Sequence, residues 1–133
     1  MLKKISSTFI LLCLVSVTGV IPVQAHHSFS VYYDPEKMVT VSGVVENFRF
    51  SNPHGIVHLE ALDDNGNEVV WTVETTAPVF MARRGWSKNT IKAGEQVTIR
   101  GWHSRDGSNL MRMQAAFRPD GSQIAGELDA NDN

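Results

Sequence analysis

Histidine is the residue type in this chain with the most chemistry to offer. The imidazole nitrogen binds Cu(II) and Zn(II) well, and among divalent first-row metals Cu(II) forms the most stable complexes. The one cysteine, Cys13, lies in an apolar segment near the start of the chain. Any metal site is therefore expected to use imidazole, and copper is the favoured ion. The five histidines are His26, His27, His54, His58 and His103.

Residues 1–25 have the pattern of a secretory signal peptide. Lys3 and Lys4 precede an apolar run, and the segment ends in Val23-Gln24-Ala25, which a signal peptidase can read. The apolar run is shorter than the ~20 residues that span a bilayer. We therefore expect cleavage after Ala25 and a periplasmic or secreted protein with no membrane span after cleavage.

Cleavage after Ala25 would make His26 the first residue of the mature chain. Its α-amine would lose its proton more readily than a lysine does, and the amine and Nδ1 of one histidine can close a chelate ring. A third nitrogen would complete the T-shaped arrangement called a histidine brace, which suits Cu(II). The candidates for that third nitrogen are His54 and His103, with His27 as a further candidate ligand.

The sequence also allows an interpretation without metal. If the chain folds as a small β-barrel, as argued below, residues 51–55 and 104–109 are expected to be loops that flank its binding face. A protein or small-molecule partner would then contact Asn52, Pro53, His54 and Trp102. His58 lies four residues after His54, about 13 Å away along a strand, so the two are not expected to share one metal. His58 is expected to face solvent, because its neighbour Leu59 is expected to face the core.

Composition narrows the function classes. Without residues 1–25 the chain has 108 residues, no cysteine, and 10 basic against 14 acidic side chains. Disulfides and thiolate chemistry are therefore not expected, and an acidic domain is a poor candidate for nucleic-acid binding. The chain contains no G-x-S-x-G, P-loop, dinucleotide-binding or H-E-x-x-H motif. A binding or accessory protein is therefore expected rather than an enzyme.

Alternation of apolar and polar residues predicts a mainly β-structure. The order is three strands, a short helix over 76–85, and two further strands, which matches a five-stranded OB-like Greek-key barrel. A small β-sandwich is the alternative. The expected strands are 38–50, 56–62, 68–75, 96–103 and 110–118, with a short edge strand at 123–124.

The expected barrel domain covers residues 38–125. Residues 26–37 form an N-terminal arm, which would have to fold back because the first strand starts at the end of the barrel opposite His54. The polar, acidic residues 126–133 are expected to be a disordered tail. Trp86 and Trp102 are expected to be partly exposed.

Several short motifs are distributed over nearly the whole mature domain. They are Ala25-His26-His27-Ser28-Phe29, Asn52-Pro53-His54, Arg83-Arg84-Gly85-Trp86 and Ile91-Lys92-Ala93-Gly94, together with Val97 and Gly101. In these motifs the chain resembles an uncharacterised family of small exported bacterial proteins, known as domain of unknown function 6152. One departure is Ala93, where such chains often carry proline, and it concerns a turn rather than chemistry. The resemblance implies an exported small β-domain and transfers no catalytic residue.

Overall fold

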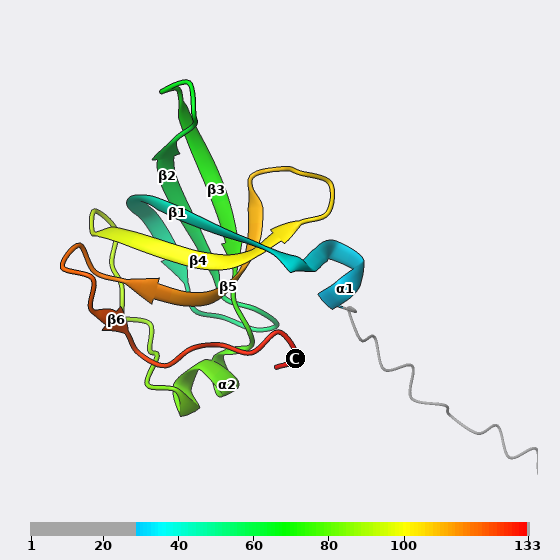
Figure 1. Cartoon of the computed structure of the whole chain (residues 1–133). Coiled ribbons are helices and arrows are strands. Elements are labelled where there is room, and N and C mark those ends of the chain that lie inside the picture. The colour runs from blue at the N-terminus through cyan, green and yellow to red at the C-terminus, as the bar shows by residue number, and fades with distance from the viewer. Residues whose placement is uncertain (1–28, 133) are drawn as a thin grey trace, which may run out of the picture.

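The structure is a computed structural model that describes residues 29–132. It is mostly antiparallel β-sheet with two short helices (Figure 1). No helix in residues 29–132 is both long and apolar enough to cross a membrane. The elements are α1 (Phe29–Tyr32), β1 (Tyr33–Arg49), β2 (Ile56–Leu62), β3 (Glu68–Glu74), α2 (Pro78–Arg83), β4 (Gln96–Ser104), β5 (Leu110–Phe117) and β6 (Gln123–Ile124).

Five strands form a ring. The neighbours in the sheet are β3-β2-β1-β4-β5, and a parallel pairing between β3 and β5 closes the circle. The strand β6 adds to the outer edge of β5. The predicted all-β class is confirmed, with α2 between the third and fourth strands. The ring of five strands is consistent with the small β-sandwich that the sequence left as the alternative to an OB-like barrel.

The long strand β1 takes part in both halves of the ring. It pairs with β4 from Met38 to Val44 and with β2 from Gly43 to Arg49. At the overlap, a Cβ atom on Gly43 would lie 2.2 Å from the backbone oxygen of Glu60. Only glycine fits such a close approach of two strands, so this position allows β1 to curve from one partner to the other.

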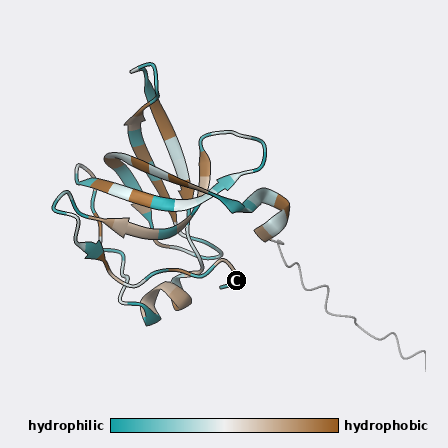
Figure 2. Cartoon of the chain, in the orientation of Figure 1, coloured by the Kyte–Doolittle hydropathy of each residue, from teal (hydrophilic) through white to brown (hydrophobic). Residues whose placement is uncertain are grey.

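Apolar side chains from alternate strand positions fill the inside of the ring. Hydrophobic and hydrophilic residues alternate along the strands in Figure 2. From α2, Met81 is fully buried, whereas Phe80 is half-buried and packs under the guanidinium of Arg83. The largest buried strand residues are Val45, Val57, Leu59, Val73, Val97, Ile99, Met111 and Met113.

Both ends of the described chain pack more closely than the sequence predicts. The strand β1 begins at Tyr33, earlier than the expected Met38. Residues 126–132, expected to be disordered, pack against the ring, because Leu128 is only 3% exposed and its backbone N–H donates to the oxygen of Gln114 at 2.7 Å. The expected exposure of Trp86 is also wrong. This side chain is 2% exposed, and its indole N–H donates to the oxygen of Gly126 at 2.8 Å.

Candidate functional site

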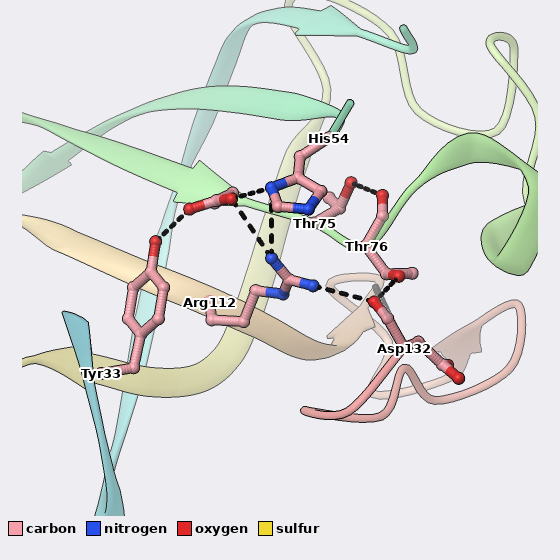
Figure 3. A network of polar contacts seen from close by, with 7 residues as sticks. Tyr33, His54, Thr75, Thr76, Arg112 and Asp132 are labelled. Carbon is pink, nitrogen blue, oxygen red and sulfur yellow. Dashed lines mark hydrogen bonds and ion pairs between the residues drawn. The ribbon is translucent and has the colours of Figure 1, made fainter. Parts of the chain in front are cut away.

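A cluster of polar side chains lies where β3 and β5 run side by side. Its members come from five separate parts of the chain: the start of β1, the β1–β2 loop, the end of β3, the middle of β5, and the C-terminal segment (Figure 3). We call it the Glu74 cluster. It comprises Tyr33, His54, Glu74, Arg112 and Asp132.

The carboxylate of Glu74 is the centre of this cluster. The hydroxyl of Tyr33 donates to Oε2. The other oxygen, Oε1, contacts Nδ1 of His54 and accepts from Nη1 of Arg112 at 3.2 Å. A single carboxylate therefore holds a phenol, an imidazole and a guanidinium together.

The guanidinium of Arg112 is buried, with only 3% of the side chain exposed. Burial lowers the pKa of Arg112, and the negative charge of Glu74 opposes that shift. Nη2 also donates to the backbone oxygen of Asp132 at 3.1 Å, and that oxygen accepts from the hydroxyl of Thr76 as well. Buried cations need such partners, because an uncompensated charge in the interior is very costly.

The strand register explains why Glu74 and Arg112 meet. They are directly opposite one another in the parallel pair β3–β5, and Val73 and Met111 form the neighbouring pair. Since successive side chains of a strand point to opposite faces, the buried Val73 and Met111 face the core and the charged pair lies on the outer face. There Arg112 is also opposite Trp102 of β4.

Tyr33 is a hydrogen-bond donor in this cluster. Burial raises its pKa, and the hydrogen bond and the negative charge of Glu74 raise it further. The phenol therefore stays protonated and continues to donate to the carboxylate well beyond neutral pH.

The β1–β2 loop brings His54 to Glu74. Its backbone pairs with the end of β3, since the N–H of Thr75 donates to the oxygen of Gly55 at 2.8 Å. A Cβ atom on Gly55 would lie 2.5 Å from Oγ1 of Thr75. The loop thus lies tightly against the strand end, with a cis peptide bond between Asn52 and Pro53.

A pocket of about 280 Å³ opens next to the Glu74 cluster. Four cluster members line it together with Phe29 and Tyr32 of α1. The segment that precedes β1 therefore lines the same pocket as His54. The lining residues are Phe29, Tyr32, Tyr33, Pro53, His54, Glu74, Leu110 and Arg112.

The metal-free interpretation named four contact residues, and the structure brings two of them to this pocket. His54 and Pro53 line it, whereas Asn52 is exposed nearby in the loop. Trp102 is half-buried on the outer face, where its ring makes an edge contact with Phe29. That ring therefore contacts the chain's own N-terminal segment.

The structure does not bring His103 to His54. His103 is opposite Met111 in the β4–β5 pair and so points to the inner face. It is 9% exposed, lies against the ring of Trp71, and its Nε2 is 2.9 Å from the backbone oxygen of Ser108. The Glu74 cluster lies on the other face of the same strands, so these two histidines do not share a site.

In the part of the chain that it describes, the structure does not place any of the remaining three histidines beside His54 either. His58 lies on β2 and pairs with Asn47, while His26 and His27 lie outside the described residues. Within residues 29–132, no group of three histidine, cysteine, aspartate or glutamate side chains is placed to hold a metal ion. A metal site that uses His54 would therefore need ligands from outside that range.

Sequence reasoning missed Tyr33, Glu74 and Arg112 as site residues. The available signal was an arginine between two buried methionines, Met111 and Met113, because an ionised side chain in an apolar strand needs a partner. The identity of that partner depends on the pairing of β3 with β5, two strands far apart in the sequence.

None of the curated proteins compared with the chain matches it. The family described as "Family of unknown function (DUF6152)" matches residues 13–112. This range includes four of the five members of the Glu74 cluster and ends at Arg112. Because the match covers most of the chain, the protein belongs to the DUF6152 family.

Proposed function

We propose that this protein is an exported Cu(II)-binding protein whose metal site combines His26, as the first residue of the mature chain, with His54. It would act as a binding or accessory protein in the periplasm or outside the cell. The observation that carries the proposal is that Phe29 and Tyr32, which follow closely after His26, line the same pocket as His54.

Reach is the first support. Two residues, His27 and Ser28, separate His26 from Phe29, and an extended chain covers at most ~3.3–3.6 Å per residue. The three steps from His26 to Phe29 therefore span at most about 10 Å, and Phe29 lines the same pocket as His54. The arm does not need to travel the length of the ring, because α1 already lies at this end.

The orientation of His54 is the second support. Its contacts with Glu74 and Arg112 are both at Nδ1, which leaves Nε2 as the nitrogen for a metal. Histidines that bind metals usually donate their other ring N–H to a carboxylate, which fixes the ring and its tautomer. Glu74 is placed to do this for His54.

The donor set is the third support. An amine and two imidazoles, without thiolate, suit Cu(II). The charges of Glu74 and Arg112 offset one another, so the positive charge beside His54 is compensated within the cluster.

The test is a Cu(II) titration, by competition with a chromophoric chelator, of protein that begins at His26. A second form carries the extension Ser-Gly-Ser-Gly before His26. A single added residue would be a poor control, because it places His27 third, where an amine, two amides and an imidazole form a copper chelate of their own. We expect weaker binding by the extended form and by His54→Ala.

The matched control is His58→Ala, which removes an imidazole away from the pocket and should leave the affinity unchanged. Electron paramagnetic resonance of the loaded protein should show nitrogen coupling that decreases in His54→Ala. Equal affinity of the two N-terminal forms would overturn the proposal.

A second candidate function is binding of a small molecule without metal. The observation that favours it is the pocket itself, which has aromatic walls from Phe29, Tyr32 and Tyr33 and polar groups at one side. Small aromatic molecules should then raise the Tm of metal-free protein, and His54→Ala should abolish the effect. No change in Tm across a panel of such molecules would count against this function.

A further inference from the structure

We infer that α1 is an anchor that positions the mature N-terminus over His54, with Phe29 and Arg105 as its positioning residues. The inference rests on the proposed copper site and adds to it the reason why two distant histidines would meet. Neither residue is a ligand in this proposal.

Phe29 holds α1 through two aromatic rings. Its ring stacks on Tyr33 with centroids 5.5 Å apart and meets Trp102 edge-on at 5.2 Å. Such pairs contribute about 0.5–1.5 kcal/mol beyond the area they bury. Tyr33 is itself bonded to Glu74, so Phe29 packs directly against a member of the Glu74 cluster.

Arg105 also holds α1, through two hydrogen bonds to its backbone. Its Nε donates to the backbone oxygen of Ser30 at 2.7 Å, and its backbone N–H donates to the oxygen of Tyr32 at 2.9 Å. Arg105 belongs to the 104–109 loop, whose expected role was contact with a partner. In this structure that loop binds the chain's own N-terminal segment.

These contacts are needed because α1 has four residues and none of them is buried. A single helical turn is not stable in water on its own, since nucleation of a helix is unfavourable. Without its anchor, the segment before β1 would sample many positions. The effective concentration of His26 near His54 would then decrease.

The test compares Cu(II) affinity in proteins that begin at His26. We expect Phe29→Ala and Arg105→Ala to weaken binding, and neither should weaken it further in a His54→Ala background, because the anchor acts through His54. The matched control is Val31→Ala. Val31 lies in the same turn with 62% of its surface exposed, and its substitution should leave the affinity unchanged.

Docking of α1 has its own readout, the indole N–H signal of Trp102 in NMR spectra of metal-free protein. This signal should shift in Phe29→Ala and stay in place in Val31→Ala. If His54→Ala weakens copper binding and Phe29→Ala does not, the anchor is overturned while the copper site stands. Further weakening by Phe29→Ala in the His54→Ala background would also overturn it. Equal affinity with and without the N-terminal extension would instead reject the copper site itself.

Discussion

The carboxylate of Glu74 contacts three side chains from three different parts of the chain. Two of these contacts, with Arg112 and with His54, have different consequences. Glu74 compensates the buried charge of Arg112, and it contacts Nδ1 of His54. The first role is structural, because an isolated buried guanidinium is destabilising. The second bears on the proposed function, because a contact at Nδ1 leaves Nε2 as the ring nitrogen that would bind a metal. Replacing Glu74 by glutamine affects both roles, so the copper affinity and the stability of that variant must both be measured.

Glu74→Gln should weaken Cu(II) binding by about 10- to 100-fold, the usual effect of losing the carboxylate behind a metal-bound histidine. The amide keeps the size of the side chain but loses the charge that orients the ring of His54. The measurement is the same competition titration, with urea unfolding to record the accompanying loss of stability. Glu68→Gln, an exposed carboxylate on the same strand, is the control, and an equal loss there would contradict a specific role for Glu74.

Tyr33 should make stability fall in alkaline solution. Its folded pKa is raised, mainly by burial and also by Glu74, whereas the unfolded phenol titrates near ~10. The native state therefore retains a proton that the unfolded state loses, so this stabilisation is complete below about pH 10 and decreases as the pH rises further.

The test uses Tyr32→Phe, which leaves Tyr33 as the only tyrosine. Its ultraviolet difference spectrum should show no tyrosinate near pH 10 until the protein unfolds. In urea the same protein should titrate near ~10. Ionisation of the folded protein at that pH would mean that Tyr33 is not buried beside Glu74.

At the level of elements, local alternation predicted most of the strands because the side-chain period of a strand is two residues. The strand β2 has the expected bounds, and the hairpin after it turns through Gly66 at a φ of 82°. The pairing of β3 with β5 has no local signature, because it joins residues 72–74 to residues 110–112. That pairing creates the Glu74 cluster, so the site was less predictable than the strands that form it.

Gly43→Ala should destabilise the protein by about 1–3 kcal/mol, the range for forcing extra atoms into a packed site. The new Cβ atom would meet the backbone oxygen of Glu60, and a backbone atom cannot turn aside as a side chain does. Urea unfolding gives the value, and Ser42→Ala, at the exposed neighbouring position, is the control. Equal stability of Gly43→Ala and the natural protein would show that β1 and β2 are farther apart here.

In the whole molecule, both ends of the described chain converge on one side of the ring. Tyr33, next to α1, reaches Glu74, and the backbone oxygen of Asp132 reaches Arg112. The contact between Asp132 and Arg112 was not predicted, because the composition of residues 126–133 suggested a disordered tail. These residues are polar except for Leu128, Ala130 and the glycine. A single buried leucine is enough to dock such a segment when its backbone also finds partners, as Gly126 does with Arg84.

Leu128→Ala should therefore destabilise the whole domain, by about 2–5 kcal/mol as for other buried leucines. A disordered tail would give no effect, so the substitution separates the packed segment from the expectation based on composition. The neighbouring Glu127→Ala is the control, because its ion pair with Arg100 is largely exposed and such pairs contribute little. Emission of Trp86, whose indole bonds to Gly126, should shift to longer wavelength if Leu128→Ala releases the segment. Unchanged emission with reduced stability would instead mean that only the leucine pocket is lost while the hydrogen bond to Gly126 survives.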